Sequence, residues 1–492
     1  MPLVTSDFEA VIGLEVHAEL RTHAKIFCGC STEFGGLPNH HVCPVCAGMP
    51  GVLPVLNRKA LEFAITTGLA LNCEIAGVTK FDRKNYFYPD LPKAYQISQY
   101  DQPVCGAGYL DVPVSDGVKR IGITRAHLEE DAGKLLHQGA PGLAGSTHSL
   151  IDLNRAGVPL LEIVSEPDIR TPEEAKAYVQ ELRSILVYLG VNDGRLEQGS
   201  LRCDANVSIR RRGETRLGTK TEIKNMNSFA AVERAIRYEI ARQIQAVEDG
   251  EPIRQETRLW NDDRQTTVVM RVKEGSADYR YFPEPDLPPI RIEAACVADL
   301  RDRLPELPAT KRQRYQQAFG LSAYDAEVLV AESAVAAYFE QAVSHYSANP
   351  KGVANWIMGE ILAHLNYEKL SVSALKVQAS HLGELVRLID EGVISGKIAK
   401  TVMARMLESG EAPSRVIDSM GLTMIADSSV LTETIKTVLA SHPAQVNDYR
   451  QGKTKVVGYL VGQIMRATQG RAKPDLVNQL LLTELDQSAD HG

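Results

Sequence analysis

The first residues that could carry chemistry lie near the N-terminus, in the segment Gly13–Leu20. Polar and apolar side chains alternate there with a period of two, so on a β-strand Glu15, His17 and Glu19 share one face. Two carboxylates and an imidazole on one face can bind a divalent cation or exchange a proton. A solvated strand face that carries a histidine by chance is the alternative, and the spacing alone leaves both open.

Further carboxylates stand where an isolated charge would be costly. Glu162 falls within the apolar run Val158–Val164, which we expect to be buried. A buried carboxylate must be paired, protonated or bound to a metal ion. In His127–Asp131 three adjacent acids repel one another, and a cation would relieve that repulsion. An acidic turn is the alternative for this cluster, and neither element decides the chemistry by itself.

Four of the eight cysteines form two close pairs, Cys28 with Cys30 and Cys43 with Cys46. Two thiolate pairs separated by 12 residues match a structural zinc site with four cysteine ligands. Unligated thiols are the alternative, and His40 and His41 in the intervening loop could compete as ligands.

Two segments combine features that suit a nucleic acid. The segment Phe81–Asp90 interleaves basic and aromatic residues, which suits phosphate contacts with base stacking. A loop packed by its own aromatic side chains is the alternative. Near the C-terminus, the stretch from Asp448 to Asp475 has a surplus of about four positive charges. The net charge of −8 argues against indiscriminate nucleic-acid binding but not against such a local basic surface.

The elements that must position these residues differ along the chain. Short apolar or alternating runs bounded by Gly, Pro, Asn and Asp predict strands joined by long loops in the first part. These strands are Val11–Leu20, Lys119–Thr124, Leu160–Val164, Ala205–Arg210 and Thr266–Val272. At least two helices interrupt them, one over Leu56–Leu71 and one from Pro172 to Leu189. For the second, Thr171 is the predicted cap and Glu174 completes a capping box. The pattern is that of an α+β fold.

A proline-rich stretch, Phe282–Pro289, cannot continue a helix or a central strand and therefore predicts a boundary. Helical spacing follows it, in Tyr324–Tyr346, Val353–Leu365, Ser428–Ala440 and Lys455–Thr468. We expect an α+β domain with a mixed or antiparallel sheet over 1–294, a helical domain over 295–409, and a small helical tail domain over 410–492.

The bulk composition narrows the class of protein. With 44% hydrophobic and 24% charged residues the chain has globular rather than disordered composition. Apolar runs are shorter than the roughly 20 residues that span a bilayer, and no secretory signal is visible at the N-terminus. Eight cysteines are too sparse for a disulfide scaffold. A soluble, cytosolic protein is expected. The sequence has no P-loop motif and no nucleophile-elbow motif.

Longer motifs stand in order along the chain: Val11–His17, Phe81–Asp90 with Lys93–Gln99, His127–Lys134, Leu161–Asp168, Gly199–Asn206 and Asp278–Asp286. Together they resemble the GatB family, which supplies one of the subunits of the aspartyl/glutamyl-tRNA amidotransferases. The resemblance runs essentially end to end. It includes the segment Gly458–Met465, which is similar to that family's YqeY-type tail domain.

The resemblance implies a two-step reaction. The side-chain carboxylate of Glu on tRNA(Gln), of Asp on tRNA(Asn), or of both, is phosphorylated by ATP, and ammonia then displaces the phosphate. The family takes that ammonia from glutamine hydrolysed by an A subunit, and a small C subunit joins the two. A chain without a glutaminase nucleophile fits this division.

The resemblance also implies roles for single residues. Carried over by motif, His17, Glu130 and Glu162 hold Mg²⁺, with Glu15 beside them as a catalytic residue. The motif leaves open whether Glu130 or the glutamate before it binds the ion. Lys84 faces phosphate or the acceptor end of the tRNA. Oxygen-rich ligands suit Mg²⁺, which neutralises ATP phosphates during phosphoryl transfer.

Beyond the magnesium site, zinc at the four cysteines is structural by the same resemblance, because the family's cysteine pairs are present in some members and absent in others. The tail grips the tRNA body by shape and phosphate. Its basic residues are Lys453, Lys455, Arg466, Arg471 and Lys473. Two rival functions are a non-catalytic tRNA-binding adaptor subunit and a stand-alone metal-dependent hydrolase.

Overall fold

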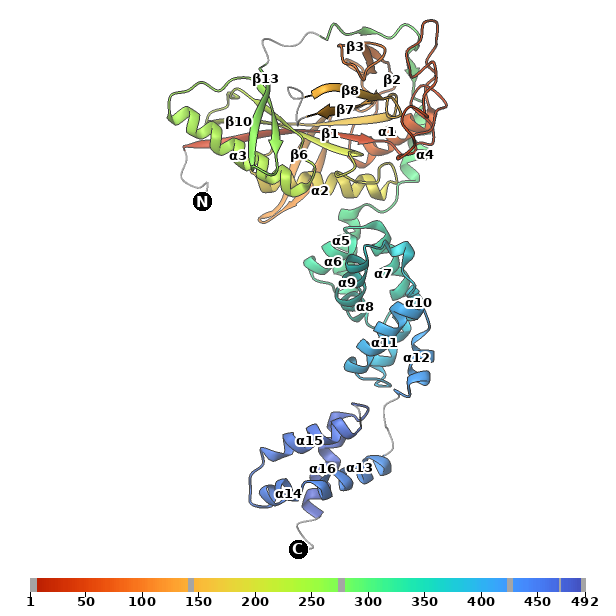
Figure 1. Ribbon diagram of the computed structural model, residues 1–492, viewed down its shortest axis with the longest axis vertical. Helices are drawn as coiled ribbons and strands as arrows, with labels where there is room; N and C mark the ends of the chain where they lie inside the picture. The colour runs from red at the N-terminus through yellow and green to blue at the C-terminus, as the bar shows by residue number, and fades with distance from the viewer. Residues whose placement is uncertain (1–6, 140–145, 273–278, 423–427, 469, 488–492) are drawn as a thin grey trace. The chain divides into compact units, whose positions relative to one another are not determined.

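The computed structural model describes residues 7–139, 146–272, 279–422, 428–468 and 470–487. It divides into two compact units, Met1–Pro308 and Ala309–Gly492. All strands of the described residues belong to the first unit, and the regular structure of the second is helical (Figure 1).

An eight-stranded sheet forms the centre of the first unit. In order across the sheet its strands are β13 (Thr266–Val272), β12 (Glu256–Asn261), β11 (Thr221–Lys224), β10 (Leu201–Arg211), β1 (Phe8–Glu19), β9 (Pro159–Ser165), β6 (Gly117–Glu130) and β5 (Gly108–Val114). Neighbouring strands are antiparallel except β11 and β12, which run parallel. The sheet is therefore mixed, and the predicted α+β class is confirmed.

Strand β1 gives the sheet one apolar and one polar face. Leu14, Val16 and Ala18 are fully buried, whereas Glu15 and His17 alternate with them and are only partly buried. This is the alternation that the sequence predicts for a strand covered on one side.

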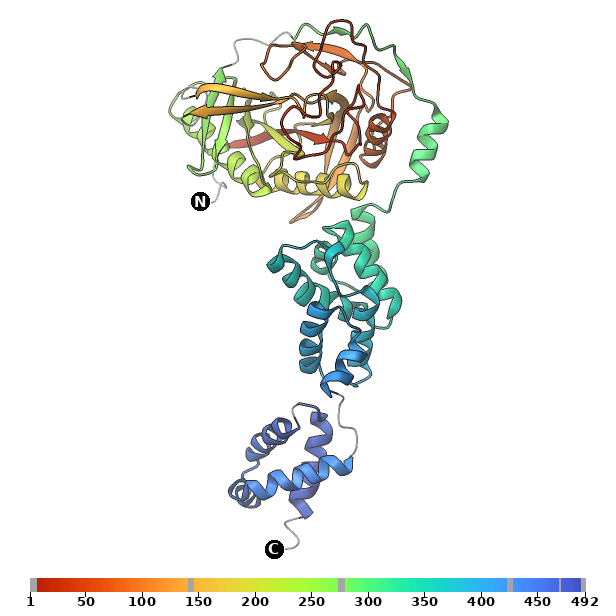
Figure 2. The same ribbon diagram turned by 45° about the vertical axis from the view of Figure 1, so that its right-hand side comes forward.

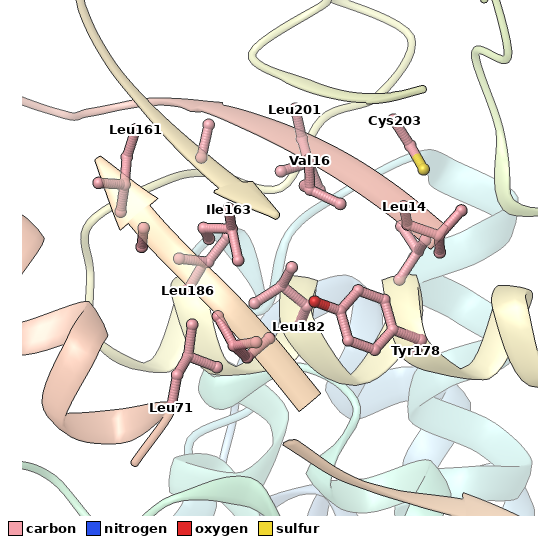
Figure 3. Close-up of a cluster of buried hydrophobic side chains, with 14 of the residues drawn as sticks. Leu14, Val16, Leu71, Leu161, Ile163, Tyr178, Leu182, Leu186, Leu201 and Cys203 are labelled. Atoms are coloured by element: carbon pink, nitrogen blue, oxygen red, sulfur yellow. The ribbon is translucent and has the colours of Figure 1, made fainter. Parts of the chain in front are cut away.

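Two long helices, α2 (Pro172–Tyr188) and α3 (Phe229–Glu248), lie along the apolar face of the large sheet (Figure 1). Figure 3 shows Tyr178, Leu182 and Leu186 of α2 among the buried side chains of the strands. The sequence analysis predicts α2 but not α3, whose apolar residues are interrupted by buried Glu239 and Gln243.

The ends of α2 follow local rules. The Thr171 hydroxyl caps the helix by accepting a hydrogen bond from the Glu174 backbone N–H at 3.1 Å. The predicted reciprocal half of the capping box is wrong. The Glu174 carboxylate instead accepts from the Arg170 N–H, at 2.7 Å, and pairs with Lys119. Gly190 ends the element in the left-handed region, with φ of +68°.

Smaller elements complete the first unit. They are β2 (Val78–Thr79) with β15 (Ile290–Arg291), β14 (Phe282–Pro283) with β3 (Asp82–Asn85) and β4 (Tyr95–Ser98), β7 (Lys134–Gly139) with β8 (Ser146–Asp152), and helices α1 (Arg58–Ala70) and α4 (Ala294–Asp302). The hairpin β7–β8 lies across the sheet from α2 (Figure 2). The polar face is thus surrounded by short strands and loops.

The proline-rich stretch 282–289 packs onto the first unit. Glu284 accepts two hydrogen bonds from the Arg83 guanidinium, at 2.7 and 2.8 Å, and Leu287 is buried in the core. Helix α4 also contributes Leu300 to that core. The first unit consequently runs to Pro308 and includes α4, which the sequence analysis places in the second domain.

The second unit is a succession of helices. They are α5 (Pro308–Phe319), α6 (Ala323–Val330), α7 (Ser333–His345), α8 (Pro350–Trp356), a π-helix (Ile357–Ile361), α9 (Leu362–Glu368), a 3₁₀ turn (Val372–Ala374), α10 (Ala379–Asp390), α11 (Gly396–Ser409), α12 (Pro413–Met420), α13 (Ser428–Ser441), α14 (Pro443–Arg450), α15 (Val456–Ala467) and α16 (Pro474–Gln487). Within the described residues, no helix is both long and apolar enough to span a membrane.

Two predicted helices of this unit differ in detail. The run Tyr324–Tyr346 is two helices, because Glu332 adopts an extended backbone that restarts the chain as α7. The run Val353–Leu365 contains the π-helical turn. Helices α13 to α16 enclose a hydrophobic cluster of their own, which includes Leu460 and Ile464. The predicted division at residues 409 and 410 stays a prediction.

The Tyr178 hydroxyl is buried, and none of the described residues hydrogen-bonds to it. Because a buried, unsatisfied hydroxyl is destabilising, we expect Tyr178→Phe to raise the free energy of unfolding of the first unit by about 1 kcal/mol. Urea denaturation measures this change. Leu182→Ala, one turn along the same helix, should lower it by about 2–5 kcal/mol and shows that the assay reports on this core. A loss of stability in Tyr178→Phe would contradict the buried, unpaired hydroxyl.

Candidate functional site

Glu162 on β9 lies between two histidines from neighbouring strands. The antiparallel registers pair it with His17 on β1 and with His127 on β6. One of its carboxylate oxygens is 3.6 Å from His17 Nε2 and 3.4 Å from His127 Nε2. Three adjacent strands therefore bring one carboxylate and two imidazoles together on the polar face of the sheet.

Glu129, and not Glu130, joins this group. The ligand atoms of His17, Glu129 and Glu162 all lie within 4.8 Å of one another, which suits a shared metal ion. Glu130 is the next residue of β6, so its side chain points to the other face. There it accepts hydrogen bonds from Lys93 Nζ, at 2.6 Å, and from the backbone N–H of Ile97. The assignment of Glu130 as a magnesium ligand is corrected to Glu129.

The charges of this group hold one another. Burial alone would raise the pKa of Glu162, but His127 and His17 hold it well below its usual range. The same pairing with Glu162 raises the pKa of His17 against the effect of its burial. Without a metal ion, a protonated imidazole therefore serves as the counter-charge of Glu162.

Lys84 on β3 adds a buried cation. Its Nζ lies 3.8 Å from a Glu129 carboxylate oxygen and 5.3 Å from the centre of the Tyr279 ring. Burial alone would lower the pKa of Lys84, but the charges of Glu129 and Glu162 raise it, so the side chain stays charged. This position beside the acidic group agrees with the role that the resemblance implies for Lys84.

Glu15 belongs to a second acidic group on the same face. Its ligand oxygen, together with those of Asp204 and Glu222, forms a set within 4.8 Å. Lys224 pairs with Asp204 and lies 3.2 Å from Glu222. Asn206 donates a hydrogen bond of 2.9 Å to Glu15. Glu15 is therefore beside the His17 group, on the neighbouring strand pair, rather than in it.

Both acidic groups line one cavity of about 640 Å³. Basic and aromatic side chains share its wall, among them Lys84, Arg202, Tyr86 and Tyr279. A cavity of this size accommodates a cofactor-sized or nucleotide-sized ligand. Its mixture of carboxylates and cations can hold a metal ion and phosphate groups together.

Glu19, the last residue of β1, lies outside that cavity and faces Asp131. Burial and the Asp131 charge raise the pKa of Glu19 to about 8. Asp131 keeps the negative charge of the pair. Burial would raise its pKa, but Arg202, 2.7 Å away, and Arg155, at 3.6 Å, lower it. The three polar residues predicted on β1 thus serve three different groups.

The four paired cysteines meet as the spacing predicts. The Sγ atoms of Cys28, Cys30, Cys43 and Cys46 all lie within 4.8 Å of one another. The Cys28 thiol, the Cys43 N–H and the nearby charge of Lys25 hold the pKa of Cys46 below its usual range. Four sulfur ligands at this separation fit a tetrahedral zinc ion. Neither His40 nor His41 belongs to the set.

The predicted basic residues of the tail lie on or near α15. Lys453, Lys455, Arg466 and Lys473 are exposed, and Lys453 pairs with Asp448 at 2.7 Å. Arg471 is partly buried and donates hydrogen bonds to the backbone carbonyls of Thr468 and Gly421. Four of the five are therefore accessible to a polyanion, and Arg471 is held by the fold.

Several residues of the site were not assigned a role from the sequence. The sequence analysis places His127 in an acidic cluster without a role, and it gives none to Asp204 or Glu222. An alternation signal exists for β10, where Arg202, Asp204 and Asn206 share one face. Which strands neighbour each other is set by the tertiary fold, so the pairing of these residues is not written in their spacing.

Comparison with known proteins gives the same answer over the whole chain. A family described as the GatB/GatE catalytic domain matches residues 10–298, and one described as the GatB domain matches residues 337–485. The chain belongs to the GatB family. This confirms the resemblance drawn from the motifs, and with it an amidotransferase subunit as the class of protein.

Individual relatives of this GatB chain agree along their full length. One from Carboxydothermus hydrogenoformans is 56% identical over 479 residues, covering 97% of this chain and 99% of the relative. One from Synechococcus sp. (strain JA-3-3Ab) is 58% identical over 481 residues, covering 98% of each. Both are named as the GatB-type subunit of an aspartyl/glutamyl-tRNA(Asn/Gln) amidotransferase.

The raised pKa of Glu19 predicts a pH-dependent stability. A carboxyl with a pKa of about 8 in the folded chain, against 4.5 for its ordinary value, stabilises the fold fully below pH 4.5. That contribution is lost as the pH rises towards 8. Relative to Glu19→Gln, we expect the wild type to lose stability between these values. Urea denaturation of the metal-free protein at stepped pH measures the difference, and a constant difference would contradict the shared proton.

Proposed function

We propose that this chain activates the side-chain carboxylate of a mischarged aminoacyl-tRNA in a tRNA-dependent amidotransferase. ATP phosphorylates the carboxylate of Glu-tRNA(Gln), of Asp-tRNA(Asn), or of both. Ammonia then displaces phosphate to give the amide. The observation that carries this proposal is the group of His17, Glu129 and Glu162, with Lys84 beside it, in one large cavity of a GatB-family chain.

Balance of the reaction assigns the work of the site. A carboxylate oxygen of the substrate attacks the γ-phosphorus, the bond to ADP breaks, and an acyl phosphate forms. Ammonia then adds to the acyl carbon, and phosphate leaves with that carboxylate oxygen. The first step gathers negative charge, which cations and preorganised donors must stabilise.

His17, Glu129 and Glu162 would hold the magnesium ion that the family implies. One imidazole nitrogen and carboxylate oxygens form a hard donor set, and their repulsion explains why a divalent cation fits. When bound, the ion neutralises phosphate charge and orients the oxygens of the transfer. His127 holds Glu162 from the other side, which fixes the position of that carboxylate.

Lys84 stabilises the charge that the transfer develops. Its ammonium group stays protonated and lies between Glu129 and the Tyr279 ring, at the wall of the cavity. From there it can bind a phosphate oxygen or the reacting carboxylate. Glu15, fixed by Asn206, would act from the second acidic group on the substrate or its cation.

Other parts of the chain serve binding. Zinc at the four cysteines would be structural, since all four ligand positions are filled by sulfur. The exposed cations of the tail would contact tRNA phosphates, a sequence-independent attraction that weakens with salt. An A subunit would supply ammonia from glutamine and a C subunit would join it to this chain, in the cytoplasm where translation takes place.

Neighbouring glutamates of β6 give a matched test of the metal assignment. Glu129→Gln removes a carboxylate of the magnesium group, so we expect Mn²⁺, used as a probe, to bind at least about tenfold more weakly. Formation of phosphorylated aminoacyl-tRNA should fall by about 10²-fold or more, while tRNA binding is kept. Glu130→Gln, one residue away on the other face, should keep Mn²⁺ affinity within a factor of about two.

The outcome separates the proposal from a non-catalytic adaptor. Manganese binding is followed by electron paramagnetic resonance, the phosphorylated product by transfer of ³²P from ATP, and tRNA binding by filter retention. An adaptor loses none of the phosphorylation in Glu129→Gln. Equal losses of tRNA binding and phosphorylation would also contradict the catalytic assignment.

A further inference from the structure

Lys25 follows the end of β1 and is completely buried. Its Nζ donates hydrogen bonds to the backbone carbonyls of His41, at 2.7 Å, and Leu153, at 3.2 Å. The same atom lies 3.5 Å from the Sγ of Cys46, one of the four clustered cysteines. A buried ammonium group therefore touches the cysteine cluster and two loops at once.

The charge of Lys25 has one anionic partner. No carboxylate of the described residues forms an ion pair with it. Burying an ammonium group with carbonyl partners alone is costly, because dipoles do not replace the hydration of a full charge. The Cys46 thiolate supplies the missing negative charge. Reciprocally, zinc with four thiolates carries two net negative charges, which need a nearby cation when buried.

The loop of the cysteine cluster is also bonded to the turn that follows β8. Asn39 donates to the Ile151 carbonyl, at 3.0 Å, and accepts from the Leu153 N–H, at 2.8 Å. Asn154 returns two bonds, donating to the Leu37 carbonyl at 2.7 Å and accepting from the His41 N–H at 2.8 Å. Lys25 lies between these two loops and bonds to both.

That turn leads directly to the acidic site. Arg155 donates to the backbone carbonyls of Ala132, at 3.0 Å, and Gly133, at 2.6 Å, just after Glu129 and Glu130 on β6. Gly157 accepts a hydrogen bond of 2.9 Å from the Ile26 N–H and begins the approach to β9 with Glu162. The cysteine cluster and the acidic group are thus joined by one continuous set of hydrogen bonds.

We propose that Lys25 is the counter-cation of the four-cysteine zinc site and couples zinc occupancy to the order of the 151–157 turn. The inference rests on the zinc site proposed above. Lys25 is a positioning residue: it neutralises the metal-thiolate group and holds the Leu153 carbonyl. Loss of zinc leaves its charge with carbonyl partners alone and loosens the turn that connects to the acidic site.

Zinc release tests the electrostatic half. Zinc leaving the full-length chain, in complex with its partner subunits, is followed with a chromogenic chelator in wild type, Lys25→Met, Lys25→Arg and Lys59→Met. We expect release from Lys25→Met to be about tenfold faster or more, as for partners that support metal ligands. Lys25→Arg keeps the charge and should stay closer to wild type. Lys59→Met, at an exposed lysine, should match wild type.

Hydrogen–deuterium exchange tests the coupling in the wild-type chain, so it does not depend on whether a variant folds. Removing zinc with a chelator should speed amide exchange in residues 153–157 more than in the helices of the second unit. Equal exchange with and without zinc, or zinc release from Lys25→Met at the wild-type rate, overturns the inference and leaves the proposed zinc site intact. A wild-type chain that neither contains nor takes up zinc overturns both.

Discussion

The site depends on the register of three strands. Antiparallel pairing of β1, β9 and β6 sets Glu162 opposite His17 on one side and His127 on the other. A slip of one residue would turn every side chain of a strand to the other face, and would place carboxylates against the helices. The fully buried residues of β1 that alternate with His17 prevent that slip, because they would have to leave the core. Packing on one face therefore fixes the chemistry on the other.

Electrostatics explains why so many charges can lie together. The acidic groups are each matched by a cation: Lys84 at Glu129, Lys224 at Asp204, and Arg202 at Asp131. An unmatched buried charge would cost several kcal/mol, so these pairs make the cavity possible. Their arrangement leaves donors and acceptors of both signs in one wall. Such a wall suits a reaction in which phosphate charge arrives, moves and leaves, and it agrees with a family whose relatives are named amidotransferase subunits.

Much of this follows from sequence, and the exceptions have physical reasons. Alternation predicted the face shared by Glu15 and His17, and paired spacing predicted the cysteine cluster, because both depend on local geometry. Assigning Glu130 instead of Glu129 came from motif likeness without the face that each side chain occupies. The pairing of His127 with Glu162 depends on which strands become neighbours, and that is decided by the packing of the whole sheet. The break before α7 carries no glycine or proline signal, since tertiary contacts bend the chain there.

Oxygen transfer tests the central claim most directly, namely that the cavity activates a carboxylate as an acyl phosphate before ammonia acts. Aminoacyl-tRNA with ¹⁸O in both oxygens of the side-chain carboxylate is supplied to the assembled enzyme with ATP and glutamine. The released inorganic phosphate is then analysed by mass spectrometry. Activation by phosphorylation predicts one ¹⁸O in each phosphate released by amidation. Phosphate without ¹⁸O, with amide formed at the normal rate, would contradict it.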